Sequence, residues 1–167
     1  MKTFLSTLLL CFSIATFAQG GLWVKTPAQD GYTVVSMSAN DQVLVAGIYG
    51  LGITIKTTVS SDWQTFFDEP DLIRPACVVI SNAGVIYVGT KDGKVFTSHD
   101  EGLSWSSLNL SGDFIEVNSI LLREASGEIY LGTDNGIFSY NSNTQLTSKV
   151  ILPNDDFIHP IYCLKEI

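Results

Sequence analysis

The sequence has few basic residues, few cysteines and no long segment with helical periodicity. Its nine lysines and arginines stand against 17 acidic residues among 167, which gives a formal net charge of −8. Such a chain is a poor partner for nucleic acid and for anionic lipid, because both are bound mainly through positive charge. A C-x-x-C motif is also absent, so the sequence carries no redox or zinc motif. We expect no metal, no cofactor and no nucleic-acid partner.

The N-terminal residues form an apolar run behind a single positive charge. Lys2 is followed by Phe4–Phe17, which contains no charged residue, and Thr16-Phe17-Ala18 then places small residues at a cleavage site before Gln19. This pattern is typical of a secretory signal peptide, and the run is short for a membrane span. We therefore predict a signal peptide over residues 1–18, a secreted, periplasmic or cell-envelope protein, and no membrane span after cleavage. An uncleaved N-terminal anchor is the alternative.

Two of the three cysteines, Cys77 and Cys163, lie beyond the predicted signal peptide. A secreted pair favours a disulfide. They lie two repeat periods apart, however, so a repeat architecture places them at equivalent positions in separate units, beyond the roughly 7 Å between Cα atoms that a disulfide spans. We expect two buried free thiols.

Internal repetition is the strongest signal in the chain. Short runs rich in Val, Ile, Thr, Tyr and Phe alternate with Gly, Asn, Asp and Ser, an all-β composition. Three such runs end on Gly47, Gly89 and Gly132, at steps of 42 and 43 residues, and Trp63 and Trp105 repeat the step of 42. Each copy holds four candidate strands, which in the second copy are Ala76–Ser81, Val85–Gly89, Lys94–Ser98 and Ser104–Asn109. A four-strand unit of this length is typical of a β-propeller blade.

The repeat predicts an all-β partial β-propeller over residues 19–167. Its three four-stranded antiparallel blades are expected at about 31–67, 74–110 and 116–152, with the start of a further blade at 158–167 and an outer strand of a preceding blade at Gly21–Lys25. Because closed propellers have at least about four blades, we expect a truncated ring. Closure by two chains is disfavoured, since each junction would lack its two middle strands.

A specific motif lies in the second copy. Ser98, Asp100, Gly102 and Trp105 fit S-x-D-x-G-x-x-W, which resembles the Asp-box of bacterial-neuraminidase-type (BNR) repeats found in sialidase-like and YVTN-like propellers. The third copy, Val117 to Phe138, resembles the two-component-regulator propeller repeat, whereas the first copy has only a degenerate box. Ser and Asp side chains in such a turn bond its own backbone. The resemblance likewise implies a structural box, lying away from the ligand face.

Candidate binding residues follow a second repeated frame, in which an aspartate precedes each first strand by a few residues. The variable last residue of this frame is Thr33, Arg74, Glu116 or His159. In a propeller this loop lies on the face where ligands commonly bind, so these four residues are predicted to ring the mouth of the central channel, with Arg74 the strongest candidate because its guanidinium can bind an anion at two points. The alternative is that they are ordinary solvated loop residues.

The functional prediction is a non-enzymatic binding or assembly scaffold, with a protein or carbohydrate ligand at the channel mouth. One alternative is a fragment of a sensor-type two-component-regulator propeller. Another is a fragment of an Asp-box glycoside hydrolase. The sialidase resemblance would require three arginines, but the chain has only Arg74 and Arg123, and no carboxylate pair stands out as catalytic. We therefore predict no catalytic residues.

Overall fold

The computed structural model describes residues 32–60, 62–66, 70–151 and 159–165. The predicted signal peptide at 1–18 and the predicted strand Gly21–Lys25 lie outside the described residues. Within the described ranges, no helix has the length and apolar character needed to cross a bilayer.

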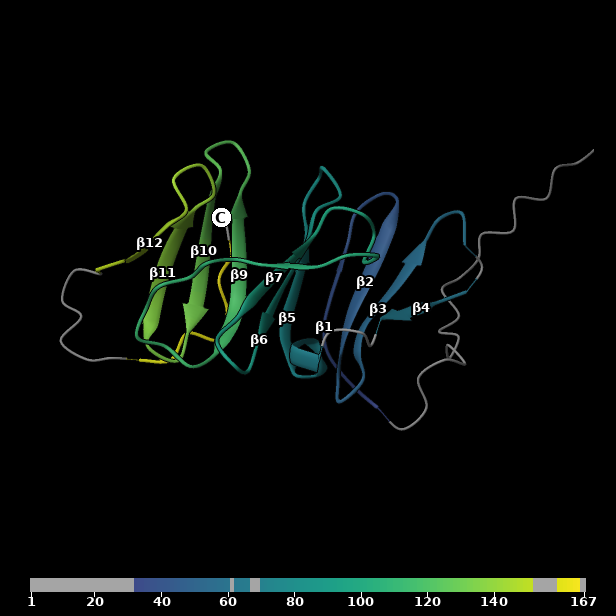
Figure 1. Ribbon diagram of the computed structural model, residues 1–167, viewed down its shortest axis with the longest axis horizontal. Helices are drawn as coiled ribbons and strands as arrows, with labels where there is room; N and C mark the ends of the chain where they lie inside the picture. The colour runs from purple at the N-terminus through teal and green to yellow at the C-terminus, as the bar shows by residue number, and fades with distance from the viewer. Residues whose placement is uncertain (1–31, 61, 67–69, 152–158, 166–167) are drawn as a thin grey trace, which may run out of the picture.

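The chain forms three four-stranded antiparallel sheets, one after another along the sequence, and each pairs its strands in chain order. We call them blades one, two and three. Blade one contains β1 (Thr33–Ala39), β2 (Val43–Tyr49), β3 (Gly52–Thr57) and β4 (Gln64–Phe66); blade two contains β5 (Pro75–Ile80), β6 (Ile86–Thr90), β7 (Val95–Ser98) and β8 (Ser106–Ser107), preceded by the short 3-10 helix η2 (Pro70–Ile73); blade three contains β9 (Val117–Arg123), β10 (Glu128–Thr133), β11 (Gly136–Asn141) and β12 (Leu146–Lys149). The blades stand side by side in Figure 1. The predicted all-β architecture of four-stranded units is confirmed.

The fourth strand of blade two is much shorter than the sequence predicts. Only Ser106 and Ser107 are in the ladder with β7, although the Leu108 amide still donates to the carbonyl of Val95 at 2.8 Å. The preceding residues belong to the turn that carries the Asp-box-like motif, and backbone amides of this turn bond to its own side chains. Those amides are therefore not available to extend the ladder.

A buried threonine closes the hairpin turn between the second and third strands in two of the blades. In blade two, the Thr90 hydroxyl accepts from the Lys94 amide at 3.1 Å and donates to the Lys94 carbonyl at 3.3 Å. In blade three, the Thr133 hydroxyl donates to the Gly136 carbonyl at 2.8 Å. Asp92-Gly93 in the first of these turns is a typical hairpin sequence, and Gly93 has a φ of +71°. The contribution of the threonine was not predicted.

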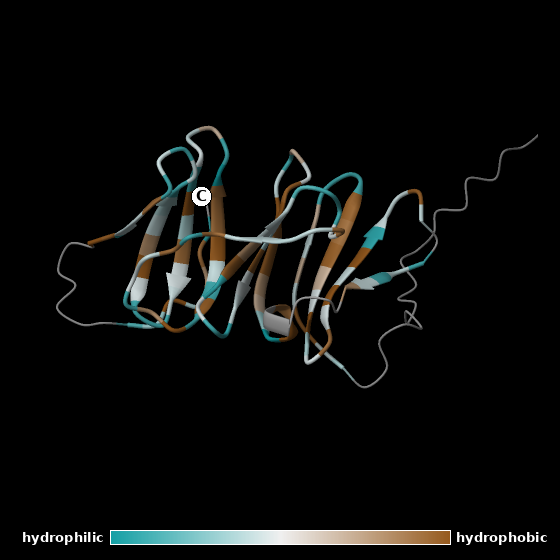
Figure 2. Ribbon diagram, in the orientation of Figure 1, coloured by the Kyte–Doolittle hydropathy of each residue, from teal (hydrophilic) through white to brown (hydrophobic). Residues whose placement is uncertain are grey.

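The hydrophobic cores lie between neighbouring blades. One cluster joins blade one, through Val45 and Ile53, to blade two, through Val78 and Val88. A second cluster joins blades two and three, and includes Cys77, Val95, Val117, Leu131 and Phe138. In Figure 2 apolar residues are concentrated in β2 of blade one, β5 of blade two and β9 of blade three. Each blade thus buries at least one face against a neighbour in the row.

The three repeated glycines occupy matching places in the blades. Gly47, Gly89 and Gly132 each lie on the second strand of their blade, opposite a small residue of the first strand: Ser36, Cys77 and Ser119. Each glycine faces the segment that follows in the row. A Cβ atom built on it would lie 3.1 Å from Cγ1 of Val78, 2.8 Å from Cγ1 of Val117 or 2.8 Å from Cγ2 of Ile161. The repeat period therefore marks the places where the next segment approaches most closely.

Residues 159–165 follow blade three in the row, although they form no strand. The Ile161 amide donates to the Thr133 carbonyl at 2.7 Å, and Ile161 lies against Gly132 as Val117 lies against Gly89. This is the place predicted for the start of a further blade. Both later cysteines are free as predicted, but only Cys77 is buried. The prediction of a buried Cys163 is wrong, because among the described residues no blade covers this segment as blade three covers Cys77.

Candidate functional site

The candidate binding residues lie where the first strand of each unit begins. Thr33 is the first residue of β1, while Arg74 and Glu116 immediately precede β5 and β9. The backbones of Arg74 and Glu116 are held alike, because each carbonyl accepts from an amide in the β6–β7 or β10–β11 hairpin turn of its own blade, Lys91 at 3.0 Å and Asp134 at 3.4 Å. We call the side of the three blades on which Thr33, Arg74 and Glu116 lie the entry edge. His159 is exposed, two residues before Ile161.

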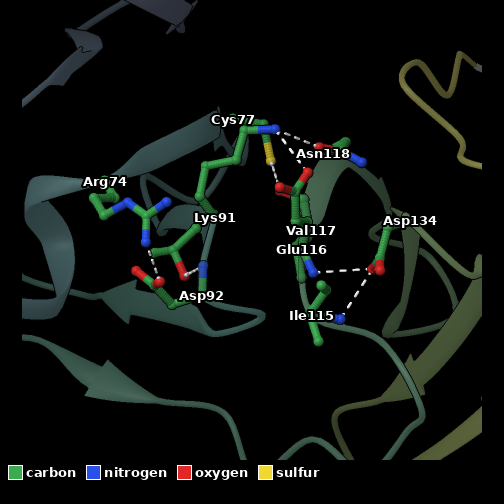
Figure 3. Close-up of polar contacts among 10 residues, drawn as sticks. Arg74, Cys77, Lys91, Asp92, Ile115, Glu116, Val117, Asn118 and Asp134 are labelled. Atoms are coloured by element: carbon green, nitrogen blue, oxygen red, sulfur yellow. Dashed lines mark hydrogen bonds and ion pairs between the residues drawn. The ribbon is translucent and has the colours of Figure 1, made fainter.

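Arg74 forms an ion pair at the entry edge. Its Nη1 lies 2.6 Å from Oδ1 of Asp92, in the hairpin turn of the same blade (Figure 3). The two side chains are 46% and 39% exposed. Exposed pairs of this kind stabilise a fold by at most about 1 kcal/mol. The main consequence is therefore geometric, because the contact uses one of five guanidinium donors and fixes where the others can point.

Glu116 is paired across the boundary between two blades. Lys91 of blade two places its Nζ 2.9 Å from Oε2 of Glu116 and 2.9 Å from Oδ1 of Asn118, both in blade three. About a third of each charged side chain is exposed. Lys91 and Asp92 are adjacent, so one dipeptide contacts both Arg74 and Glu116 and links two of the predicted binding residues (Figure 3).

Asp134 fixes the loop that leads into β9. Its Oδ1 accepts from the amides of Ile115 and Glu116, each at 2.9 Å. The side-chain amide of Asn135 also donates to the carbonyl of Asp113, a residue of the repeated frame. Asp134 and Asn135 are residue types typical of turns, but here they also anchor the loop that carries Glu116. The predicted site is therefore built on fixed backbone at this blade.

Large apolar side chains accompany the polar ones along the entry edge. The residue before each of Thr33, Arg74 and Glu116 is apolar or aromatic and exposed: Tyr32 at 51%, Ile73 at 43% and Ile115 at 72%. The sequence frame identified these positions but not their exposure. The structure thus places an exposed apolar residue beside each candidate in blades one to three. Ion pairs with the adjacent residues Asp92 and Lys91 connect Arg74 with Glu116. Thr33 and His159 belong to the first and last segments of the row.

The Asp-box-like motif, Ser98 to Trp105, forms a closed turn on the outer side of blade two. The fully buried Ser98 hydroxyl donates to Oδ1 of Asp100 and accepts from the Gly102 amide, at 2.9 and 2.8 Å. The Ser104 hydroxyl and amide donate to the Asp100 carboxylate at 2.6 and 2.8 Å. These bonds, first of all the one from the Ser104 hydroxyl, lower the pKa of Asp100 below its ordinary value. All four contacts lie within the motif.

The same turn packs on the neighbouring blade, a role that the sequence did not predict. Gly102 has a φ of +90°, and a Cβ atom there would lie 2.6 Å from Cδ1 of Ile55 and 3.0 Å from Cε2 of Phe66, both in blade one. Trp105 also packs against the core between the first two blades. The motif therefore joins blades, and glycine is required by both its backbone angle and its neighbours.

No metal site accompanies these features in the part of the chain that the structure describes, where no group of three His, Cys, Asp or Glu residues could hold an ion. Buried Cys77 donates to the Val117 carbonyl at 3.7 Å, and burial raises the pKa of its thiol to about 12. It is therefore an inert thiol in the core between the second and third blades.

Comparison with known proteins gives a match at the level of fold. Neither a protein-family model nor a curated protein matches the chain. Among solved structures, it is similar to the extracellular domain of a B. thetaiotaomicron protein named as a hybrid two-component system, with a TM-score of 0.60 and 19% identity over 75% of this chain and 18% of that chain. It is also similar to Ycf48 bound to D1 peptide, with a TM-score of 0.57 and 16% identity over 75% of this chain and 41% of that chain. The computationally designed protein Ika4 has a TM-score of 0.62 and 14% identity over 84% of this chain and 83% of that chain. The three sheets resemble propeller blades. At these identities the likeness shows the fold alone, and the chain spans under a fifth of the length of the B. thetaiotaomicron domain.

Proposed function

We propose that this protein is a non-enzymatic binding scaffold of the secreted or cell-envelope compartment, and that its ligand lies along the entry edge. The observation that carries the proposal is the pairing of Arg74 and Glu116 through the adjacent residues Asp92 and Lys91. Charged side chains that are held in place and still partly exposed lose little conformational freedom when they bind a ligand.

A polypeptide is the ligand class that this edge suits best. The exposed apolar side chains of Tyr32, Ile73 and Ile115 alternate with polar or charged neighbours. A peptide offers apolar and charged groups at similar spacing, whereas the contacts of a carbohydrate are dominated by hydroxyls. The structural similarity to Ycf48, which was solved with a peptide, agrees with this choice. A carbohydrate ligand is the alternative.

A sensor module is the second candidate function. The similarity to the extracellular domain of a two-component system favours it. In both candidates the segment binds a ligand without transforming it. A glycoside hydrolase is less well supported, because the fixed charges at the entry edge are two ion pairs rather than two carboxylates facing one bond.

The test is selection of peptides from a displayed random library on the full chain, followed by affinity measurement on variants. Arg74→Ala and Glu116→Gln should each weaken the selected peptides about tenfold, as expected for loss of a charged contact. Glu101→Gln, at an exposed site on the Asp-box-like turn, is the control matched in charge change to Glu116→Gln. If selected peptides bind both entry-edge variants as well as the parent chain, the ligand does not lie on this edge.

A parallel assay addresses catalysis. Release of sialic acid and of β-glucan fragments should be absent for the parent chain. Turnover that disappears in Arg74→Ala would overturn the non-enzymatic proposal.

A further inference from the structure

A pocket lies on the side of the row opposite the entry edge. The β5–β6 and β9–β10 hairpins join the far ends of the strands that begin at the entry edge (Figure 1). Between these hairpins is a hollow of about 270 Å³. Its apolar lining comes from both blades, and includes Val85 and Tyr87 of blade two and Leu122 and Ile129 of blade three. This volume is below the range of about 300–1,000 Å³ typical of sites for drug-sized ligands, so it suits a single side chain.

Two carboxylates in the lining are held in fixed positions. Glu124 accepts from the backbone amide of Asn82 at 2.7 Å through Oε1, and from the side-chain amide of Asn82 at 3.0 Å through Oε2. Glu128 accepts through Oε2 from the Tyr130 hydroxyl at 3.2 Å and from the Ser126 hydroxyl at 3.4 Å. Both oxygens of Glu124 keep a second lone pair after their contacts with Asn82. The pocket therefore has hydrogen-bond acceptors held in fixed positions beside apolar side chains.

Glu124 places a negative charge near Tyr87 in this pocket. Burial and, after it, the charge of Glu124 raise the pKa of Tyr87 above its ordinary value, so its phenol is neutral at physiological pH. Arg123 also lines the pocket and already has an interaction of its own. The lining carries two carboxylates and one guanidinium, which leaves one formal negative charge.

We propose that this pocket binds a primary alkylammonium group, presented as a lysine side chain of a partner polypeptide. The aliphatic stem would lie against Val85, Leu122 and Ile129, as lysine stems commonly lie along apolar surface while the charged end reaches polar groups. The ammonium would bond to Glu124 and approach the face of the Tyr87 ring. No part of this site overlaps the entry edge, so it stands or falls independently of the function proposed above.

The experiment titrates the full chain with Nα-acetyl-lysine methylamide and follows backbone amide shifts at Tyr87 and Gly127. The neutral analogue Nα-acetyl-norleucine methylamide measures the contribution of the charge. We expect the lysine probe to bind at least tenfold more tightly than the norleucine probe. Glu124→Gln should reduce lysine binding about tenfold, with a smaller reduction for Glu128→Gln. The matched control Glu101→Gln should leave it unchanged.

Further variants and an unfolding measurement distinguish a loss of binding from a loss of folding. Because Glu124→Gln also loses one bond from Asn82, thermal unfolding of each variant is measured alongside binding, and Glu128→Gln provides an independent test. Arg123→Gln removes the positive charge of the lining and should strengthen lysine binding several-fold; weaker binding there would overturn the proposal. Equal affinity for the lysine and norleucine probes would do so as well. Tighter binding of free cadaverine than of the lysine probe would reject a polypeptide as the source of the ammonium.

Discussion

Replacing Gly89 by alanine tests the packing between blades two and three. The new methyl carbon would lie 2.6 Å from Sγ of Cys77, 2.8 Å from Cγ1 of Val117 and 3.1 Å from the Val117 carbonyl oxygen. Carbon atoms in comfortable contact are about 3.5–4.0 Å apart, so the methyl group is too close to both blades. Val117 is fully buried and β-branched, and it cannot turn away cheaply.

The expected cost is the overpacking penalty less a gain in backbone entropy. Overpacking a core typically costs about 1–3 kcal/mol, and alanine is favoured over glycine within a strand by roughly 0.5–1 kcal/mol. Gly89→Ala should therefore lower the free energy of unfolding by about 1–2 kcal/mol. For a chain of this length that corresponds to roughly 2–8 °C in Tm.

Gly47→Ala is the matched control, because it lies at the equivalent position of blade one. Its nearest neighbours would be Cγ1 of Val78 at 3.1 Å and Cβ of Pro75 at 3.2 Å, so overpacking and backbone gain should cancel to within about 0.5 kcal/mol. Urea unfolding followed by tryptophan fluorescence measures both. Adding Val117→Ala to Gly89→Ala should recover at least about 1 kcal/mol as coupling energy. Equal stability of the two single variants, or strict additivity in the double variant, would refute this account of the interface.

Two further predictions concern titratable groups. Because the pKa of Asp100 is lowered by its bonds from Ser104, the carboxylate stabilises the fold above the ordinary pKa of 3.8, and this contribution is lost as the pH falls through the lower folded value. Thermal unfolding of Asp100→Asn should therefore approach that of the parent chain as the medium is acidified below that value; a constant difference would contradict this role. At pH 8, an aromatic disulfide reagent should react quickly with exposed Cys163 and with buried Cys77 only after denaturation. Rapid native labelling of Cys163→Ser at Cys77 would show that the blades open.

The fold was predictable because glycine spacing reports a backbone requirement. Gly47, Gly89 and Gly132 mark the points where the next segment leaves little room for a side chain. A requirement of that kind reappears in each unit and is visible in the sequence as a period. The hairpin at Asp92-Gly93 was predictable for a related reason, because its glycine adopts a positive φ.

Contacts between units were less predictable, because a period does not specify which side chains meet. Ser36 and Ser38 of β1 accept hydrogen bonds from the amides of Val78 and Ile80, each 42 residues further along the chain. The equivalent positions in blade two, opposite Gly89 and Tyr87, are occupied by Cys77 and Val79, which have no hydroxyl. These bonds therefore belong to one junction only. The contact of Gly102 with blade one was missed for the same reason, since nothing in the Asp-box-like motif indicates which residues it contacts.

At the candidate site, the repeated fold fixes the backbone but does not determine which side chain is present. At Arg74 and Glu116 the hairpin turns bind the backbone carbonyls, and these bonds would form whatever side chain the residue carried. The same structural position in blade one carries Thr33, so three different chemistries occupy one place in the fold. The blades do not require any of them, in contrast to Gly89, where a side chain would crowd the next blade. Equivalent exposed positions can therefore carry different side chains, and so prefer different ligands, without weakening the packing between the blades.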